Sequence, residues 1–392
     1  MRISFTGDIM CELPSLRRAK RADGYCFDGI FAGTEETFRN TDYLVGNLET
    51  VFAGPERDYS RDIYSYNTPD SFAAAVKAAN FHMVSTANNH CLDRGIDGLR
   101  RTLDVLDEVG IKHAGTARTR EETVPLVEEI GSFRVGFLAY TYGSNYAVNQ
   151  VALGQEDSYM VNFITPQSWT FMPRAGWSNA LKERLLTRET RVRLMRLLGR
   201  TYNIPRIDDY EPGGIEPRVF GEIAALKEKC DRVILLLHAG GQFNGEPGRY
   251  TQTVVEELAK TGVDAIIGNH PHVVQSVQMH GNTLTAYSLG NFFIAPDTVY
   301  LIHQYLPLYS IVLHMDLTQA CERVSYSFSI VKNVLHRKKE TVSDVWPLYQ
   351  QIGDRSEKER LLSDCRFIYE RVTGKKMPDF TMKREYLLEF CE

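Results

Sequence analysis

Two histidines on either side of a proline, His270-Pro271-His272, are the residues of this chain best suited to bind a metal ion. They follow an apolar run at residues 265–267, which predicts a buried strand. Proline fixes the backbone between the two rings near one φ value. Imidazoles that leave the end of a strand one residue apart can direct their nitrogens towards a common point, so this segment predicts a metal-binding loop.

Other residues with ligand chemistry also stand where predicted strands end. They are Asp8, Asn47, Glu49, Asn88, Asn89, His90, Asp93 and His238. Taken singly, each has a structural explanation, because aspartate can cap a helix and asparagine favours turns. In open α/β sheets, however, sites form beyond the carboxyl ends of the strands. Their shared placement therefore predicts one site that these distant segments build together.

Carboxylate, amide and imidazole groups together suit a borderline divalent metal such as Mn, Fe, Zn or Co. The clusters offer no cysteine pair, which argues against a structural zinc site. A cation with open coordination positions can lower the pKa of a bound water and polarise a phosphoryl or carbonyl oxygen. The predicted chemistry is metal-assisted hydrolysis or group transfer.

His90 and Asp93 are predicted catalytic residues. Asp93 follows His90 by three residues in a turn, where its carboxylate can orient the imidazole ring and stabilise its protonated form. That arrangement suits a general acid. Asp93 can equally cap the helix that leads towards Leu99, and the two roles do not exclude each other.

Short apolar runs without polar alternation predict strands buried on both faces of a sheet. They lie at residues 3–6, 43–45, 83–86, 135–140, 233–237, 265–267 and 284–289. Helical patterns alternate with these runs, at residues 71–79, 98–109, 222–229 and 253–260. Alternation of this kind predicts a layered α/β domain.

The last part of the chain breaks this rhythm. Residues 309–317 and 324–330 alternate in polarity and predict an antiparallel pair, after which the chain is charged and has a helical pattern. We therefore predict one main domain at residues 1–335 and a helical C-terminal extension at residues 336–392.

An arginine-rich insertion at residues 168–217 also interrupts the alternation. Its segment 178–198 carries apolar residues at roughly helical spacing, with arginines over much of the rest. One interpretation is a solvated surface helix. Another is a lid in which Arg188 and Arg191 contact an anionic substrate, since guanidinium groups bind carboxylate and phosphate in bidentate fashion. A third is attachment to a membrane surface, although the segment is short of large aromatic residues.

Composition limits the class of protein. The chain has 392 residues, of which 43% are hydrophobic and 24% charged, values ordinary for a globular enzyme. A net charge of −5 gives no support to nucleic-acid binding. No run approaches the roughly 20 apolar residues that cross a bilayer, and no secretion signal precedes the first strand, so we expect a cytoplasmic protein. Seven scattered cysteines without Cys-x-x-Cys spacing predict reduced thiols.

The order of these motifs resembles the CapA family, which is associated with poly-γ-glutamate capsule synthesis and belongs to the calcineurin-like metallophosphoesterase superfamily. The residues that carry the resemblance, from position 1 to about 295 without the insertion, are Asp8, Asn47, Glu49, Asn88, Asn89, His90, Asp93, Gly95, His238, His270, His272, Ser288, Leu289, Gly290, Asn291 and Phe292. The resemblance implies a four-layer α/β/β/α sandwich with its site at the strand ends. It also implies a catalytic role for His90 and metal ligands at Asp8, Asn89, His238, His270 and His272.

Three positions depart from the family pattern. Met10 stands where phosphoesterases carry the histidine of Asp-x-His, Asn47 stands at the usual bridging aspartate, and Asn269 replaces the first histidine of Gly-His-His-Pro-His. Glu49 can substitute for the missing carboxylate, because residues i and i+2 of a strand share a face. Fewer anionic ligands weaken the binding of a second ion, so we expect Mn, Fe or Zn as one or two ions.

Four neighbouring polar residues are predicted substrate contacts: Asn47, Asn88, Ser288 and Asn291. The segment that contains Ser288 and Asn291 can equally form a simple turn around Gly290.

The predicted function is a metal-dependent hydrolase or transferase that makes or processes poly-γ-glutamate or another anionic cell-envelope polymer. One alternative is a non-catalytic subunit of a capsule assembly complex that keeps the metal pocket for binding. Another is a cytosolic phosphodiesterase or phosphatase that acts on a small phosphorylated substrate.

Overall fold

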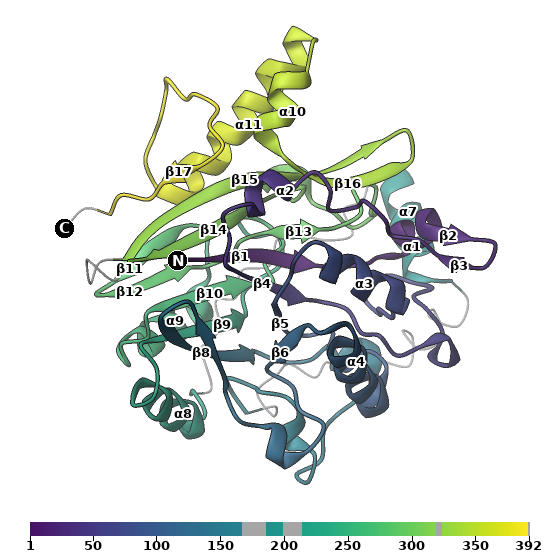
Figure 1. Cartoon of the computed structure of the whole chain (residues 1–392). Helices are drawn as coiled ribbons and strands as arrows, with labels where there is room; N and C mark the ends of the chain where they lie inside the picture. The colour runs from purple at the N-terminus through teal and green to yellow at the C-terminus, as the bar shows by residue number, and fades with distance from the viewer. Residues whose placement is uncertain (167–185, 199–213, 319–323, 391–392) are drawn as a thin grey trace.

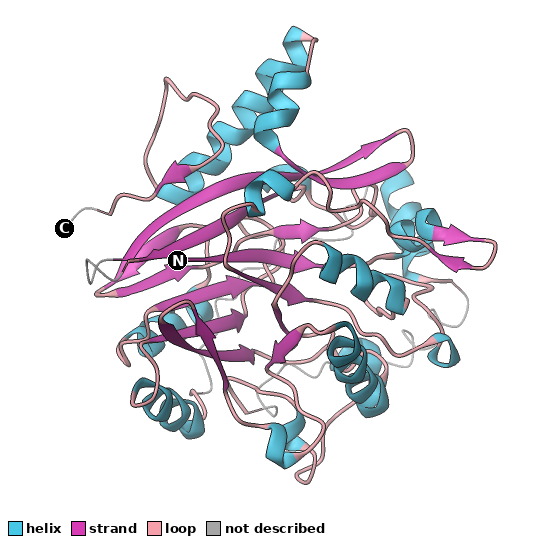
Figure 2. Ribbon diagram, viewed as in Figure 1, coloured by secondary structure: helices cyan, strands magenta, loops and turns pink. Residues whose placement is uncertain are grey.

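The structure, a computed structural model, describes residues 1–166, 186–198, 214–318 and 324–390. Two β-sheets pack against each other in the middle of the molecule, and helices cover their outer faces (Figure 1). Figure 2 shows the same arrangement by secondary structure, with strands at the centre and helices at the periphery.

The larger sheet has nine strands, in the order β16-β15-β14-β1-β4-β5-β6, with β13 on β1 and β17 on β15. Their bounds are β1 (Arg2–Ile9), β4 (Tyr43–Leu48), β5 (Met83–Ser85), β6 (Lys112–Ala114), β13 (Asn291–Phe293), β14 (Tyr309–Leu317), β15 (Val324–His336), β16 (Lys339–Asp344) and β17 (Tyr386–Leu387). β1 is parallel to β4 and antiparallel to β14. The first predicted strand is therefore at the centre of this sheet.

The smaller sheet has six strands, in the order β11-β12-β10-β9-β8-β7. Their bounds are β7 (Leu126–Ile130), β8 (Phe133–Thr141), β9 (Arg232–His238), β10 (Ala265–Asn269), β11 (Val277–His280) and β12 (Thr283–Ala286). The four middle strands are parallel, and β7 and β11 are antiparallel edges. The run predicted at residues 284–289 ends at Ala286, because the chain then crosses to the larger sheet and continues as β13.

Helices α1 (Leu13–Ala19), α3 (Asp70–Ala78) and α4 (Gly95–Val109) cover the larger sheet, and α8 (Pro217–Lys227) and α9 (Arg249–Ala259) cover the smaller one. Phe5 and Phe137 lie in the core between the sheets, Phe72 in the core under α3, and Ile223 and Val254 in the core under α8 and α9. The fold is thus the predicted four-layer α/β/β/α sandwich.

The predicted helices are all present, with shifted ends. α8 begins five residues before the predicted start, because Pro217 lies in its first turn, where proline is favoured. α4 ends at Gly110, whose φ of 72° places it in the left-handed region that terminates many helices. Shorter elements are α2 (Glu35–Phe38), α5 (Tyr146–Asn149) and the hairpin of β2 (Lys20–Arg21) with β3 (Gly24–Tyr25).

The ends of strands from both sheets lie in register at one edge of the sandwich. Asp8 pairs with Asn47 of β4 and with Asn291 of β13, and His238 pairs with Asn269 of β10. Gly7 permits the close approach of β1 to the 287–292 segment, because a Cβ there would lie 1.8 Å from the Gly290 carbonyl oxygen. The edge that carries the candidate ligands is therefore tightly packed.

The C-terminal part contains two strands, β16 and β17, that the prediction of a helical extension did not include. Residues 339–344, expected to belong to the helical extension, form β16, the edge strand of the larger sheet. Their charged composition hides a period of two, in which Glu340, Val342 and Asp344 are buried. Helices α10 (Val345–Gln351) and α11 (Arg355–Thr373) follow, and α11 buries Cys365 and Ile368 in the inter-sheet core. The extension is packed onto the sandwich.

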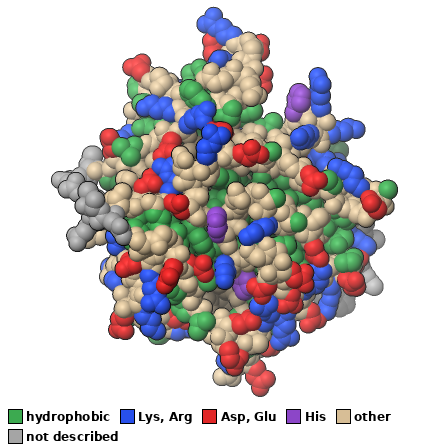
Figure 3. Space-filling view, in the orientation of Figure 1, with side chains coloured by type: hydrophobic (Ala, Val, Ile, Leu, Met, Phe, Trp, Pro, Cys, Tyr) green, Lys and Arg blue, Asp and Glu red, His purple; other side chains and the backbone are tan. Residues whose placement is uncertain are grey.

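Of the arginine-rich insertion, the structure describes residues 186–198 and 214–217; the segment 178–185 lies outside the described residues. Helix α7 (Arg188–Leu197) lies in the described part of the helical segment predicted at residues 178–198. No helix in the described ranges is both long and apolar enough to cross a lipid bilayer. Figure 3 shows acidic and basic side chains interspersed over one face of the molecule.

The cysteines that the structure describes are free: Cys11, Cys26, Cys91, Cys230 and Cys365. Cys321 and Cys391 lie outside the described residues.

Candidate metal centre

Polar side chains from strands of both sheets meet in one buried cluster. Asp8 lies near the end of β1, Asn47 near the end of β4, and His238 is the last residue of β9. Asn47 Nδ2 donates a hydrogen bond to Asp8 Oδ1 at 2.8 Å and lies 3.2 Å from His238 Nδ1. All three side chains are buried. Segments far apart in the sequence thus share one interior site.

Glu49 lies at the centre of this cluster without a hydrogen-bond donor. Neither of its buried carboxylate oxygens has a hydrogen-bond partner among the described residues. Its Oε1 lies 3.8 Å from His90 Nε2, 3.6 Å from His238 Nε2 and 3.9 Å from His272 Nε2. Burial, and then the nearby Asp8, raise the pKa of Glu49 well above its usual range. A buried carboxylate in this state needs a cation or a proton.

The His270-Pro271-His272 loop has an unusual backbone. His270 has φ 101° and His272 has φ 58°, values that side-chain-bearing residues rarely adopt. Such strain persists where surrounding contacts impose it, and it concentrates at functional sites. Here the strained loop places His270 Nδ1 3.0 Å from His238 Nε2 and His272 Nδ1 3.2 Å from Asp8 Oδ2.

Burial lowers the pKa of His238 and of His270 well below the usual value, and the neighbouring histidines lower it further. Both rings are therefore neutral at physiological pH, which is the form that binds metals. The His270 Nδ1 and His238 Nε2 atoms lie 3.0 Å apart, a distance at which one neutral ring can donate a hydrogen bond to the other.

Two overlapping sets of side chains have the spacing of metal ligands, Glu49 with His270 and His272, and Asp8 with Glu49 and His238. Within each set the ligand atoms lie within 4.8 Å of one another. Asn89 adds an amide oxygen 2.7 Å from His238 Nε2. Oxygen and imidazole ligands, together with two buried carboxylate oxygens that lack hydrogen-bond partners among the described residues, fit a divalent cation. A polar core in which every group was hydrogen-bonded would not require one.

His90 and Asp93 form a buried pair beside this cluster. His90 Nδ1 lies 2.7 Å from Asp93 Oδ2, which also accepts a hydrogen bond from the backbone N–H of Tyr66 at 2.7 Å. The N-terminal cap of α4 is Arg94, and no side-chain bond caps it. The alternative role of Asp93 as a helix cap is therefore absent, and its carboxylate orients His90.

Several neighbours of the cluster had no place among the residues singled out from the sequence. The Asn145 amide nitrogen lies 3.1–3.2 Å from both ring nitrogens of His90, and its oxygen accepts from Asn89. The Tyr66 ring packs on His90 with centroids 4.4 Å apart. Asn145 follows the end of β8, so the strand-end argument extended to that strand would have found it, whereas nothing in the sequence indicates Tyr66.

Two more aromatic rings border the metal-ligand candidates. The Tyr142 ring centroid is 4.9 Å from that of His270, and the Phe243 centroid is 5.7 Å from that of His272. Phe243 also has a positive φ of 58° and donates its backbone N–H to the Pro271 carbonyl at 2.8 Å. The loop after β9 therefore packs directly on the histidine loop.

The predicted substrate contacts divide into two groups. Asn47 contacts the cluster directly, and Asn291 Oδ1 lies 3.0 Å from His272 Nδ1. Asn88 instead donates to the Leu48 carbonyl at 2.7 Å, and Ser288 accepts from the N–H of Gly290 within its own turn. The structure brings the first pair to the site and gives the second pair partners in the backbone.

Helix α7 lies beside the same site. Val192 is buried in a hydrophobic cluster with Tyr66 and Phe243, the two rings that pack on His90 and His272. The backbone N–H of Arg188 donates to Asp62 at 2.7 Å, which fixes the start of the helix. Among the described contacts, no bond joins Arg188 or Arg191 to the metal-ligand candidates.

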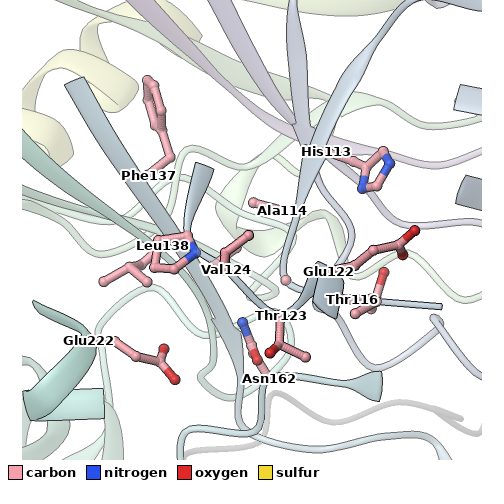
Figure 4. A pocket seen from close by; sticks show the side chains of 14 residues that line it. His113, Ala114, Thr116, Glu122, Thr123, Val124, Phe137, Leu138, Asn162 and Glu222 are labelled. Carbon is pink, nitrogen blue, oxygen red and sulfur yellow. The ribbon is translucent and has the colours of Figure 1, made fainter. Parts of the chain in front are cut away.

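A separate hollow of about 60 Å³ lies at the edges of the two sheets, away from this cluster (Figure 4). Its lining includes His113, Glu122 and Glu222, and none of the candidate metal ligands. Glu122 pairs with Arg118 at 3.0 Å and Glu222 pairs with Arg218 at 3.3 Å. Because its carboxylates already have cationic partners, this hollow lacks the unsatisfied charge that distinguishes Glu49.

The fold and this site define the class of protein: a four-layer α/β/β/α sandwich with a buried carboxylate and histidine cluster at its strand ends. The chain belongs to the family described as Bacterial capsule synthesis protein PGA_cap, which matches residues 2–295. The match includes every candidate ligand and leaves out the C-terminal extension.

Three relatives illustrate the range of similarity. The uncharacterized protein y4sH of Sinorhizobium fredii (strain NBRC 101917 / NGR234) is 28% identical over 292 residues, 67% of this chain and 61% of that protein. The PGA biosynthesis protein CapA of Bacillus subtilis (strain 168) is 24% identical over 294 residues, 74% and 62% of the two chains. The capsule biosynthesis protein CapA of Bacillus anthracis is 23% identical over 295 residues, 74% and 59%. The chain thus spans about three fifths of the length of these relatives.

Among solved structures, the 5'-nucleotidase from Candida albicans SC5314 is similar at 11% sequence identity, with a TM-score of 0.37 and coverage of 83% of this chain and 50% of that one. A similarity this distant carries no information about the chemistry of the site.

Proposed function

We propose that this protein is a metal-dependent hydrolase or transferase of capsule biosynthesis that acts on an anionic cell-envelope polymer such as poly-γ-glutamate. The proposed ligands of one or two divalent ions, Mn, Fe or Zn, are Asp8, Glu49, Asn89, His238, His270 and His272. The proposed catalytic residues are His90 and Asp93. The capsule context derives from the family and from the printed names of the two CapA relatives.

The observation that carries this proposal is Glu49, a fully buried carboxylate with no donor among the described residues and three imidazoles within 4 Å of Oε1. Burying a lone carboxylate costs several kcal/mol unless it is protonated or paired with a cation. Structural polar clusters satisfy their members by hydrogen bonds. A cluster whose central acceptors are unmatched is built for a bound ion.

A bound divalent ion would supply a Lewis acid and lower the pKa of a water molecule. The side chains of this chain supply the proton. Asp93 holds the Nδ1 side of His90, so Nε2 is the ring nitrogen that would exchange the proton. The Asn145 amide nitrogen at 3.1 Å and Glu49 Oε1 at 3.8 Å lie next to Nε2. His90 would donate that proton to the leaving group, and Asp93 would stabilise the imidazolium beforehand.

The first test measures metal and turnover together. Metal analysis of the purified protein, with and without added Mn²⁺, should show at least one bound ion. Turnover should be assayed on bis(p-nitrophenyl) phosphate, on p-nitrophenyl phosphate and on poly-γ-glutamate. Metal-dependent cleavage of the polymer supports the proposal, whereas cleavage of the small esters alone favours the phosphodiesterase or phosphatase alternative.

His90→Ala separates catalysis from binding. Losing a general acid should lower turnover by about 10²–10⁴-fold while the metal content holds, because His90 lies beside the ligand set and outside it. The control is His336→Ala, which removes an exposed imidazole at the end of β15 and should leave turnover unchanged. Unchanged turnover in His90→Ala would refute the general-acid assignment.

A non-catalytic metal pocket is the second candidate, favoured by one observation. Met10, at the position where phosphoesterases carry an imidazole, is 1% exposed and packs with Tyr66 and Phe243 in an apolar cluster. A site with one ligand fewer can hold an ion without activating a nucleophile. Bound metal with no turnover on any of the three substrates would favour this candidate.

The α7 arginines provide a test of the substrate class. Because α7 packs beside the site, Arg188 and Arg191 are proposed to contact an anionic polymer. Charge reversal at both positions should weaken polymer binding in a salt-dependent way, since salt screens the attraction between the arginines and an anionic polymer. Equal binding by the variant would leave α7 as a plain surface helix. The matched control is charge reversal at Arg355, which is 92% exposed and lies on α11.

A further inference from the structure

The C-terminal helix α11 reaches the loop that packs on the histidine loop. Its residue Arg371 is largely buried, with 11% of the side chain exposed. Arg371 Nη1 donates a hydrogen bond to the Gly245 carbonyl and lies 3.4 Å from the Glu246 carboxylate. Gly245 lies only two residues after Phe243 in the same loop.

The guanidinium of Arg371 also lies close to two aromatic rings. Its Cζ lies 4.7 Å from the ring centroid of Tyr305 and 4.9 Å from that of Phe367. Contacts of this kind attract a cation to an aromatic face. Gly245 is the residue type that admits the guanidinium, because a Cβ at that position would lie 2.3 Å from Nη1. These contacts therefore fix the orientation of the Arg371 guanidinium as well as its position.

The loop that Arg371 contacts connects β9 with α9 and touches two parts of the histidine loop. Phe243 donates its backbone N–H to Pro271 and packs its ring on His272. Asn244 accepts a hydrogen bond from Gln275 at 3.0 Å through its carbonyl. Arg371 thus fixes the far end of the loop, and Phe243 transmits that position to His272.

We propose that Arg371, on a helix outside the family match at residues 2–295, is a positioning residue that holds Phe243 against the His272 imidazole of the proposed metal centre. This inference rests on the proposed metal-binding function. It assigns to the C-terminal extension a part in building the site. Residues that orient a metal ligand from behind typically change metal affinity by about 10–100-fold when they are removed.

The test compares Arg371→Met with Arg366→Met in the full chain. Arg371→Met keeps an apolar stem and loses the donor, and should weaken Mn²⁺ binding by about 10-fold in calorimetric titration. Arg366 is exposed on the same helix, so Arg366→Met should bind Mn²⁺ as the wild type does. If the Mn²⁺ affinity of Arg371→Met lies within about twofold of that of the wild type, a difference in binding free energy below about 0.5 kcal/mol, the proposal is overturned.

A spectroscopic signature separates positioning from loss of stability. Co²⁺ bound to Arg371→Met should show a shifted visible spectrum, because the geometry at His272 changes, while Arg366→Met keeps the wild-type spectrum. Weaker Mn²⁺ binding with an unchanged Co²⁺ spectrum overturns the positioning role, since it would reflect a merely less stable protein.

Phe243→Leu tests the same chain of contacts by changing the loop residue, and it replaces Arg371→Met in the experiment if that variant does not fold. It should weaken Mn²⁺ binding comparably, and the double variant should bind about as well as the weaker single variant, because both changes break one chain of contacts. Unaltered Mn²⁺ affinity in Phe243→Leu, or additive losses in the double variant, overturn the proposal. If the wild-type protein binds no Mn²⁺, the proposed metal centre itself is wrong. If the wild type and the variants bind Mn²⁺ equally, only the positioning role of Arg371 is wrong.

Discussion

Glu12 and Glu49 are both buried carboxylates, 2% and 0% exposed, and they differ in what surrounds them. Glu12 accepts hydrogen bonds from the hydroxyls of Thr298 and Tyr300, and from that of Tyr66 at 3.4 Å. Glu49 accepts none among the described residues. Burial raises the pKa of both, that of Glu12 to about 7 and that of Glu49 well above its usual range. Burial of an acid alone therefore does not indicate an ion site, whereas a buried carboxylate without donors must either be protonated or bind a cation.

Of the substitutions that test the difference between Glu49 and Glu12, Glu49→Gln should have the largest effect on Mn²⁺ affinity. The variant loses the anionic ligand, so Mn²⁺ affinity should fall by more than about 100-fold in calorimetric titration. Without metal, burial favours the protonated form of Glu49, and glutamine has nearly the same shape and no charge. The free energy of unfolding in EDTA should therefore change by less than about 1 kcal/mol.

Glu12→Gln is the matched control for that experiment. Because hydroxyls satisfy Glu12, its substitution should leave Mn²⁺ affinity within about threefold of the wild type, less than 1 kcal/mol. Equal losses of affinity in Glu12→Gln and Glu49→Gln would break the distinction between the two carboxylates.

The contrast also shows what the sequence could predict. Strands that end in Asp8, Glu49 and His238 were identifiable from apolar runs followed by polar residues, because parallel strands bring their carboxyl ends to one edge. The partners of Glu12 were not, because Thr298 and Tyr300 reach it from a distant loop and no local spacing records that contact.

The fold shows the same limit. The alternation of strands and helices, which is local information, predicts a layered α/β domain, whereas the number of layers was implied by the resemblance to the CapA family. The assignment of residues 291–293 to the larger sheet is not local, because β13 pairs with β1 across nearly the whole domain. β16 was missed because two of its three buried positions are the acids Glu340 and Asp344, so its composition resembles that of a solvated segment.

The pH dependence of Glu12→Gln should be the second-largest effect. The pKa of Glu12 is about 7 in the folded protein, above its ordinary value of 4.5, so the folded state holds this proton more tightly than the unfolded state. The stability that this proton contributes is full below pH 4.5 and is lost as the pH rises through about 7. Relative to Glu12→Gln, the wild type should lose about 2 kcal/mol between pH 5 and 7.5, measured by urea unfolding in EDTA. Parallel pH profiles would contradict this expectation.

His314 offers a satisfied histidine to compare with the unsatisfied cluster. Its ring lies between the hydroxyls of Ser4 at 2.8 Å and Ser329 at 3.1 Å. Burial, followed by the charge of Arg2, lowers the pKa of His314 to about 4. Stability from the neutral ring is present above pH 6.5 and is lost as the pH falls towards 4. Relative to His314→Gln, the wild type should lose about 1 kcal/mol between pH 7 and 5.5, with no effect of added Mn²⁺ on the difference. A profile that Mn²⁺ alters would place His314 in the metal site.

Tyr66→Phe should give the smallest effect. The change removes the hydrogen bonds of the hydroxyl with Tyr300 at 3.1 Å and with Glu12 at 3.4 Å and keeps the ring on His90, so unfolding should become easier by about 0.5–1 kcal/mol. Turnover should stay near that of the wild type, because the ring contact and the N–H bond to Asp93 remain. A large loss of turnover would show that the hydroxyl itself takes part in the reaction.

The position of β1 has a consequence for synthesis on the ribosome. β1 lies between β4 and β14 in the larger sheet, and about 300 residues separate its end at Ile9 from the start of β14 at Tyr309. At the usual 5–20 residues per second, the nascent strand waits about 15–60 s for its second neighbour. During that interval one edge of the central strand stays open to pairing with other chains, so co-translational chaperones should bind this protein for longer than one whose sheet closes in chain order.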